Sequence, residues 1–248
     1  GGKKTPEFPA LAAWGLKRGA ARLADPVMEN ALVIGASGGI GMALCAALRG
    51  RGVSVTPLSR RDDGLDITDE ASVEAALGRL EGPFDLIFVA TGALELHGRG
   101  PEKSLRHVTP EAMLDQFRLN CLGPSLILKH AVRLMPRDAR CVFAALSARV
   151  GSIGDNGYGG WYAYRTAKAA LNQMIHTSAI ELARSHRASI CVALHPGTVE
   201  TPLTAKYAGS HPTVTPQEAA TNLLGVIDGL TPEDSGLFYD WAGKPVPW

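Results

Sequence analysis

The sequence predicts an α/β fold with a single, doubly wound parallel sheet and helices on both faces. Short apolar runs alternate with segments of helical spacing along most of the 248 residues. The first apolar run enters its helix through a cluster of glycines, and the run FDLIFVA at 84–90 is typical of a strand buried on both faces. Repeated strand and helix units imply right-handed crossovers between parallel strands, which give this arrangement.

The elements follow one another in pairs. The first strand, residues 31–35, leads into a helix in which Ile40, Leu44 and Leu48 share one face. The other strands are expected at residues 53–59, 84–90, 141–146, 188–196 and in the final GLFYDW run. The other helices are expected at residues 71–80, about 110–135, 163–185 and 216–230, the last opening with a proline.

The composition excludes several classes of function. The 25 Lys and Arg against 24 Asp and Glu leave a net charge of +1, whereas nucleic-acid binders usually carry a basic surplus. No apolar run reaches the roughly 18 residues of a membrane helix, so neither nucleic acid nor a membrane is an expected partner. The four cysteines form no CxxC pair and lie mostly in apolar segments, which favours reduced, buried thiols in a cytoplasmic protein without a metal site.

Residues 1–27 differ from the rest of the chain. They begin with Gly-Gly, carry five Lys/Arg against two Asp/Glu, and precede Met28, after which the regular pattern starts at once. We expect Met28 to be the natural start and residues 1–27 to be a leader added during expression. An organelle presequence is the alternative. Residues 28–248 then form a single domain, since α/β folds of this length often do not divide.

A glycine turn joins the first strand to its helix. In GASGGIG, backbone N–H groups and the helix N-terminus can face a pyrophosphate, which side chains would keep away. Gly35 permits the tight turn, Gly39 the approach of phosphate, and Gly41 the packing of helix on strand. The turn predicts a dinucleotide site formed by Gly35, Ser37, Gly38, Gly39, Ile40 and Gly41.

A second motif, Tyr164-Arg-Thr-Ala-Lys168, lies on a predicted helix, where residues four apart share one face. A phenol with a pKa of about 10 is a poor acid or base near neutrality, but a nearby ammonium lowers that pKa. Tyr164 could then exchange a proton with a carbonyl or alcohol oxygen. The alternative is an ordinary exposed tyrosine and lysine. Tyr162 does not fit, because its i+4 residue is Thr166.

The spacing GxxxGxG followed by YxxxK resembles the short-chain dehydrogenases/reductases over about residues 30–248. Within that family, the GSIGDNGYGGWYAYRTAKAALN stretch and the FYDWAGKPVPW ending are similar to the C-factor and sniffer-type carbonyl reductase branch. The resemblance implies a Rossmann-type domain in which hydride passes between a nicotinamide and a small carbonyl or alcohol, with Tyr164 as acid/base and Lys168 on the nicotinamide ribose. We expect a homodimer or homotetramer.

Pro124 lacks an N–H, so the carbonyl of Asn120, four residues earlier in the predicted helix, loses its donor. Asn120-Cys-Leu-Gly123 resembles the family's Asn-x-x-Gly site, which implies that the Asn120 backbone holds a water connecting Lys168 to solvent. A kinked helix with a capping asparagine is the alternative.

This chain departs from the family pattern at the substrate-binding serine. In the family this serine lies three residues before a glycine that follows the central strand. Counting back from Gly151 places Ala148 at that position. A one-residue shift would present Ser147, which we predict to fill the role. Ser152 is a further candidate, and a site with Tyr164 as its only strong donor is the alternative.

Other segments resemble family contacts to the cofactor. The PGxVxT stretch implies nicotinamide carboxamide contacts from Pro196, Gly197, Val199 and Thr201, with His195 structural. Asp66 and Ile67 resemble the pair of family residues that contacts the adenine of the cofactor. Ala90, Thr91 and Gly92 occupy the place of the family's NNAG, with Ala90 replacing an asparagine.

The end of the second strand selects the dinucleotide. An Asp there would accept bonds from the ribose hydroxyls of NAD(H) and repel a 2′-phosphate, whereas this chain has Ser59-Arg60-Arg61. A hydroxyl and guanidinium forks suit a phosphate, with Ser37 as a further donor, so we predict NADP(H), with NAD(H) possible. The alternative is that RRDDG is only a solvated turn.

The segment Pro202–Pro216 is expected to be a mobile substrate lid, with Trp161, Leu203 and Tyr207 lining the pocket. The favoured function is an NADP(H)-dependent carbonyl reductase or alcohol dehydrogenase. The alternative is a dinucleotide-binding regulatory or signalling protein with little turnover. A Rossmann-type methyltransferase is disfavoured by YxxxK and PGxVxT.

Overall fold

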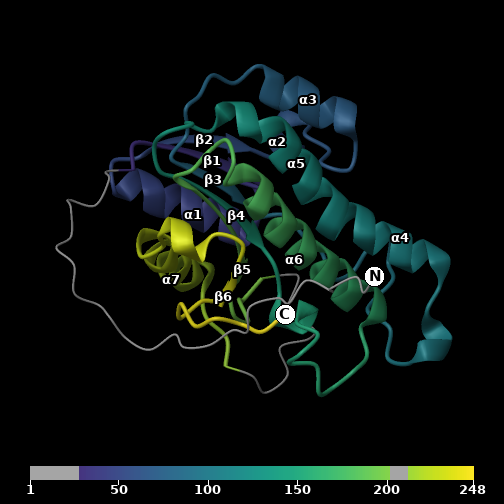
Figure 1. Ribbon diagram of the computed structural model, residues 1–248. Coiled ribbons are helices and arrows are strands. Elements are labelled where there is room, and N and C mark those ends of the chain that lie inside the picture. The colour runs from purple at the N-terminus through teal and green to yellow at the C-terminus, as the bar shows by residue number, and fades with distance from the viewer. Residues whose placement is uncertain (1–27, 202–211) are drawn as a thin grey trace, which may run out of the picture.

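The structure is a computed structural model that describes residues 28–201 and 212–248 (Figure 1). Residues 1–27 and most of the segment expected to be a lid, including Leu203 and Tyr207, lie outside the described residues. The strands are β1 (Asn30–Ile34), β2 (Ser54–Leu58), β3 (Leu86–Val89), β4 (Cys141–Leu146), β5 (Ser189–His195) and β6 (Phe238–Asp240). The α-helices are α1 (Gly39–Gly50), α2 (Arg60–Asp63), α3 (Glu70–Gly78), α4 (Pro110–Phe117), α5 (Gly123–Ala131), α6 (Tyr162–Leu182) and α7 (Pro216–Asp228).

The six strands form one sheet in the order β2-β1-β3-β4-β5-β6, and every pairing is parallel. This confirms the predicted α/β fold. Helices α1 and α7 pack together on one face, while α3, α5 and α6 cover the other (Figure 1). Because side chains alternate along a strand, Leu32 and Ile34 enter the core under α3, α5 and α6, whereas Ala31 and Val33 enter the core under α1 and α7.

The helix predicted over 110–135 is interrupted, which corrects that expectation. Helix α4 ends at Phe117, a π-helical turn spans Arg118–Leu122, and α5 starts at Gly123. Pro124 explains the break, because it has no N–H for a continuous helix but fits the first turn of a new one. A second difference is α2, a single helical turn where the sequence indicated strand end and turn; Ser59 caps it by accepting a bond from the Asp62 N–H.

The strand order reverses at β1, which pairs with β2 on one side and β3 on the other. In open parallel sheets, the carboxyl ends of strands at such a switch point form a ligand crevice. A groove of about 940 Å³ lies there.

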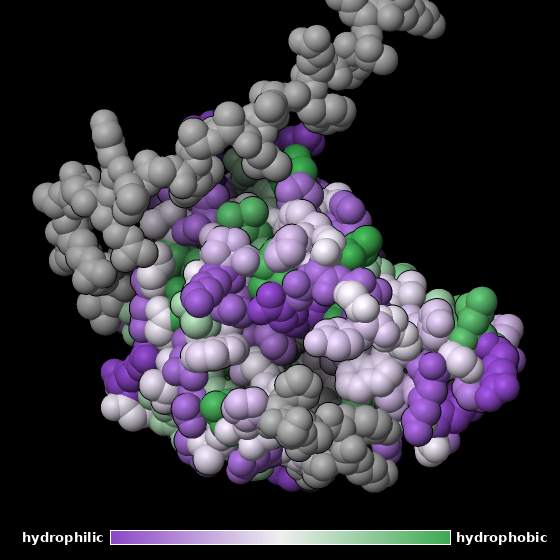
Figure 2. All heavy atoms as spheres, turned by 90° about the horizontal axis from the view of Figure 1, so that it is seen from below, coloured by the Kyte–Doolittle hydropathy of each residue, from purple (hydrophilic) through white to green (hydrophobic). Residues whose placement is uncertain are grey.

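Across residues 28–201 and 212–248, no helix has both the length and the apolar character to cross a bilayer. On the face in Figure 2, hydrophilic residues dominate the centre, and hydrophobic ones form small, separate spots between them. The four cysteines are buried and unpaired.

Candidate active site

The glycine turn has the tight turn and the close packing predicted for Gly35 and Gly41, while the phosphate approach predicted for Gly39 stays a prediction. Gly35 has a φ of +85°, and a Cβ there would lie 2.9 Å from Thr91 Cγ2. At Gly41 a Cβ would lie 2.2 Å from the Gly35 carbonyl oxygen, closer than any real contact. A Cβ at Gly39 would lie 3.1 Å from Thr201 Cγ2, so the turn touches the 196–201 segment. Glycine is therefore needed for the turn and for close packing of α1 on β1.

The groove brings together most of the residues predicted to bind the cofactor. These are Gly35, Ser37, Gly38, Ser59, Arg60, Asp66, Ile67, Ala90, Thr91 and Gly92. The groove is not lined by Gly39, Ile40, Gly41 or the residues of 196–201. Within the described part of the chain, Thr91 Oγ1 is buried with no hydrogen-bond partner. A cradle of glycines and an orphaned hydroxyl both fit a bound polar ligand.

The groove is also lined by Asp66, whose carboxylate accepts bonds from the Thr68 N–H (2.8 Å) and hydroxyl (2.7 Å). These bonds hold the pKa of Asp66 below its usual value. Ile67 is buried, and a Cβ on Gly123 would lie 2.6 Å from its Cδ1. Gly123 therefore lets α5 approach the predicted adenine pair.

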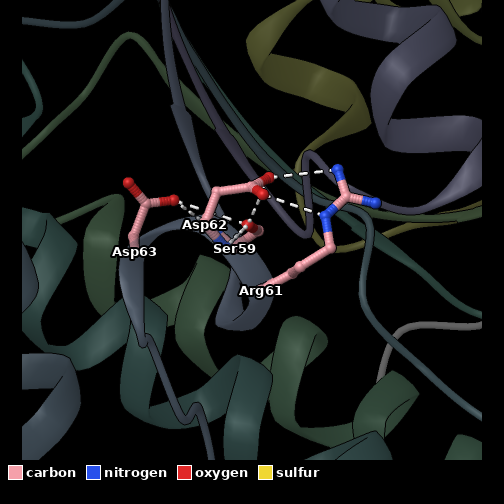
Figure 3. Close-up of polar contacts among 4 residues, drawn as sticks. All are labelled: Ser59, Arg61, Asp62 and Asp63. Carbon is pink, nitrogen blue, oxygen red and sulfur yellow. Dashed lines mark hydrogen bonds and ion pairs between the residues drawn. The ribbon is translucent and has the colours of Figure 1, made fainter.

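The end of β2 carries two carboxylates that the sequence argument did not weigh. Figure 3 shows Asp62 and Asp63 beside Ser59, with Arg61 turned toward Asp62. The Ser59 N–H donates to Asp63 Oδ2 (2.7 Å), and its hydroxyl donates to Asp62 Oδ2 (3.1 Å). Arg61 Nε lies 2.9 Å from Asp62 Oδ1, which lowers the pKa of Asp62. Arg60 and Arg61 are both exposed and line the groove, and Arg61 already has an anionic partner in Asp62.

Tyr164 and Lys168 lie one turn apart on α6. Lys168 Nζ is 5.8 Å from the centroid of the Tyr164 ring and donates to the Leu146 carbonyl at 2.8 Å. Burial lowers the pKa of Lys168 to about 7 and raises the pKa of Tyr164. The expected lowering of the phenol pKa is therefore not seen, because burial raises it.

Asn120 is fully buried and its side chain is fixed. Its amide donates to the Ala93 carbonyl (3.0 Å) and to Gln116 Oε1 (2.6 Å), and its Oδ1 accepts from the Ala93 N–H (3.3 Å). A Cβ on Gly92 would lie 2.9 Å from Asn120 Oδ1 and 3.3 Å from Lys168 Nζ. The structure thus brings Asn120 and Lys168 together across Gly92. Sequence reasoning missed Gln116, whose signal is its position one turn before Asn120.

Ser147 is buried, and its hydroxyl donates to Asn172 Oδ1 at 2.6 Å. Because a hydroxyl has one proton, Ser147 has none left for a substrate oxygen in this arrangement. Ser152 likewise donates to the Pro247 carbonyl. The role predicted for Ser147 stays a prediction, and the geometry favours the alternative in which Tyr164 is the strong donor.

The 196–201 segment lies beyond the end of β5. Gly197 has a φ of +80°, and a Cβ there would lie 3.1 Å from the Trp241 ring. Val199 is buried and pairs with Val214. Burial lowers the pKa of His195 to about 4, so it is neutral, as suits a structural residue. Trp161 packs edge to face against Tyr164, with ring centroids 6.4 Å apart.

The chain is similar in sequence to known oxidoreductases. A family model described as enoyl-(acyl carrier protein) reductase matches residues 64–235. The chain is 33% identical over 236 residues to 1-hydroxy-2-glutathionyl-2-methyl-3-butene dehydrogenase of Rhodococcus sp. (strain AD45), covering 89% of this chain and 100% of that protein. It is 34% identical over 167 residues to C-signal of Myxococcus xanthus, covering 67% of this chain and 94% of that protein.

Solved structures share the fold. Carbonyl reductase Sniffer of D. melanogaster superposes with a TM-score of 0.75 at 20% identity, covering 90% of this chain and 100% of that one. A short-chain dehydrogenase/reductase of Burkholderia multivorans with bound NADP gives a TM-score of 0.72 at 25% identity, with the same coverage. The chain therefore belongs to the short-chain dehydrogenase/reductase family of oxidoreductases, and the family resemblance found in its sequence is confirmed.

Proposed function

We propose that this protein is an NADP(H)-dependent carbonyl reductase or alcohol dehydrogenase in which Tyr164 exchanges a proton with the substrate oxygen. One observation carries the proposal: Tyr164, Lys168 and Asn120 meet beside the glycine-lined groove, with Gly92 between the Asn120 and Lys168 side chains. The Rhodococcus relative supports it, because its name specifies the dehydrogenation of an alcohol.

With a raised pKa, Tyr164 can serve as the general acid in carbonyl reduction. A phenol that keeps its proton at neutral pH can donate it to a carbonyl oxygen as negative charge develops there. Lys168, with a pKa of about 7, can gain or lose a proton near neutrality and so restore the phenol. Asn120, held by Gln116 and Ala93, keeps the space beside Lys168 polar. When bound, the nicotinamide supplies the hydride.

The groove residues would hold the cofactor through their backbone N–H groups and polar side chains. The glycine turn offers N–H groups to the pyrophosphate, and Asp66 with Ile67 borders the adenine site. Pro196, Gly197, Val199 and Thr201 would meet the carboxamide. Thr91, whose hydroxyl has no partner in the described part of the chain, lines the same groove.

The preference for NADP(H) rests on Arg60. Arg60 and Arg61 both line the groove and are exposed, but Arg61 is paired with Asp62. The Burkholderia structure contains NADP, which supports the preference. Asp62 and Asp63 oppose it, since carboxylates repel a 2′-phosphate, so we expect a moderate preference for NADPH with measurable use of NADH.

The second candidate is a dinucleotide-binding regulator or signalling protein with little turnover. Two observations favour it: the hydroxyls of Ser147 and Ser152 are committed to Asn172 and Pro247, and C-signal is 34% identical over 67% of the chain.

A panel of small aliphatic and aromatic ketones and aldehydes, assayed with NADPH and separately with NADH, distinguishes the two. Turnover that depends on a nicotinamide supports the oxidoreductase. NADPH binding by fluorescence titration without turnover of any carbonyl, or of the corresponding alcohols with NADP⁺, supports the regulator. Sedimentation analysis of the same sample tests the predicted homodimer or homotetramer, and fractionation of the source cells tests the predicted cytoplasmic location.

A further inference from the structure

The first turn of α6 carries Tyr164 but does not cap itself. Its N-cap residue, Trp161, makes no side-chain capping bond, and the first turn contains no acidic residue. The N–H groups at the start of a helix have no partners within the helix and need them from elsewhere. Here a partner comes from the connection between β3 and α4, 61 residues earlier in the chain.

Glu102 supplies that partner twice. Its backbone carbonyl accepts the Trp161 N–H at 2.6 Å, and its carboxylate Oε2 accepts the Ala163 N–H at 3.2 Å. Glu102 is only 7% exposed, although glutamate is rarely buried unless its carboxylate has a partner. The two N–H groups precede Tyr164 by three residues and by one residue, so Glu102 fixes the backbone from which the phenol projects. A carboxylate at a helix N-terminus is also favoured by the helix dipole.

The same contact stabilises a strained residue. Trp161 has a φ of +55°, a left-handed conformation that residues with a Cβ rarely adopt. Such strain persists where surrounding contacts determine it, and it concentrates at functional sites. The bond from the Trp161 N–H to the Glu102 carbonyl is one of these contacts, and the Trp161 ring packs edge to face against Tyr164.

The connection that carries Glu102 is itself anchored near Asn120. Gln116 donates to the Leu94 carbonyl at 2.9 Å and accepts the bond from Asn120. Glu102, Gln116 and Tyr164 line one small cavity. The connection therefore links two parts of the site, the asparagine on the π-helical turn and the tyrosine on α6.

We propose that Glu102 is the positioning residue for Tyr164, an acidic cap that the connection between β3 and α4 donates to the first turn of α6. The proposal rests on the proposed function, in which Tyr164 exchanges the proton. It acts through placement of the phenol and involves no contact between Glu102 and substrate. Loss of the cap should therefore lower kcat more than it alters binding.

The test compares Glu102→Ala, Glu102→Gln and Glu111→Ala. The control Glu111 is exposed and lies in the first turn of α4, a helix that does not carry Tyr164. We expect Glu102→Ala to lower kcat about 10- to 100-fold, since small misplacements of reacting groups cost that much. The KM for the carbonyl and the Kd for NADPH should stay within about threefold. Glu102→Gln keeps an oxygen acceptor for the Ala163 N–H and should retain activity within about threefold, as should Glu111→Ala.

Amide hydrogen exchange separates this proposal from the proposed function. Glu102→Ala should speed exchange in the first turn of α6 and leave the last turn unchanged, whether or not the protein turns over a carbonyl. If wild-type protein reduces no carbonyl, the proposed function fails. Amide hydrogen exchange still tests whether Glu102 caps the first turn of α6. Unchanged exchange, unchanged kcat in Glu102→Ala, or a Glu102→Gln variant as impaired as Glu102→Ala would overturn the proposal. If Glu102→Ala does not fold, Glu102→Asp replaces it, with the same expected direction.

Discussion

The two ends of the predicted site are held together in different ways. At the serine end, Ser59–Asp63, the hydrogen bonds and the Arg61–Asp62 ion pair join residues at most four positions apart, and most of the side chains are exposed. At the tyrosine end, formed by Gly92, Asn120, Tyr164 and Lys168, the bonds join distant segments. They run from Ala93 to Asn120, from Glu102 to Ala163, and from Leu146 to Lys168.

Because of this difference, we expect the two ends to determine different properties of the protein. Exposed ion pairs contribute about 0–1 kcal/mol and rearrange easily, so the serine end can adapt to either dinucleotide. Buried polar groups with fixed partners are costly to disturb, because a lost partner leaves an unsatisfied group away from water. Changes at the tyrosine end should therefore affect stability and turnover, whereas changes at the serine end should affect cofactor choice.

The largest effect is expected at the glycine turn between the two ends. Gly41→Ala would place a Cβ 2.2 Å from the Gly35 carbonyl oxygen, so the backbone must shift. We expect a loss of about 3 kcal/mol of unfolding free energy and at least roughly tenfold weaker NADPH binding. Gly225→Ala in α7 is the control, since a Cβ there meets nothing within 4 Å and should stabilise by up to about 1 kcal/mol. Equal stability of Gly41→Ala and wild type in urea would contradict the packing role.

The buried lysine should make stability depend on pH. Lys168 has a pKa of about 7 in the folded protein against 10.5 ordinarily, so between these values the unfolded chain binds the extra proton. Its contribution to stability therefore rises with pH above 7, by at most about 1.4 kcal/mol per pH unit. Urea unfolding between pH 7 and 9 should give a smaller rise for Lys168→Met than for wild type. Equal slopes would mean that Lys168 is not desolvated.

Ser147→Ala distinguishes a structural hydroxyl from a substrate donor. Removing the hydroxyl leaves Asn172 Oδ1 without its donor, so unfolding free energy should fall by about 1–3 kcal/mol. Turnover should stay within about threefold, because Tyr164 remains as the donor. Ser178→Ala, which loses only a contact to the Met174 sulfur, is the control. A fall in turnover of about 100-fold at unchanged stability would restore the substrate role predicted for Ser147.

The smallest effects are expected at the serine end. Arg60→Ala should lower the preference for NADPH over NADH about tenfold, with unchanged stability. Asp62→Asn should raise the preference by a few fold, since it removes a carboxylate and releases Arg61. The ratio of kcat/KM for the two cofactors measures both, with the exposed Arg184→Ala as control. An unchanged ratio in Arg60→Ala would exclude it as the phosphate contact.

The sequence predicted the features whose causes are local. The alternation of strands and helices gave the parallel sheet, and the glycine turn has the close approaches assigned to Gly35 and Gly41. The YxxxK spacing placed Tyr164 and Lys168 on one helix, where they lie. Pro124 signalled a disturbance, but the expected continuous helix was wrong because proline could start α5 after a π-helical turn.

The features that were missed depend on contacts between distant segments. No pattern around Ser147 indicates that Asn172, 25 residues later, accepts the hydrogen bond from its hydroxyl. The raised pKa of Tyr164 follows from burial, which the spacing of tyrosine and lysine does not contain. Glu102 sits in an irregular connection without periodicity, so its capping of α6 could not be predicted before the fold was known.

The central claim is that Tyr164 supplies the proton to the substrate oxygen. Single-turnover reduction of the best carbonyl by NADPH, measured for wild type and Tyr164→Phe at neutral pH, tests it most directly. Phenylalanine keeps the ring beside Trp161 and Lys168 and removes only the hydroxyl. We expect the rate to fall about 10²- to 10⁴-fold, with NADPH affinity and stability nearly unchanged. A rate within about threefold of wild type would contradict the account.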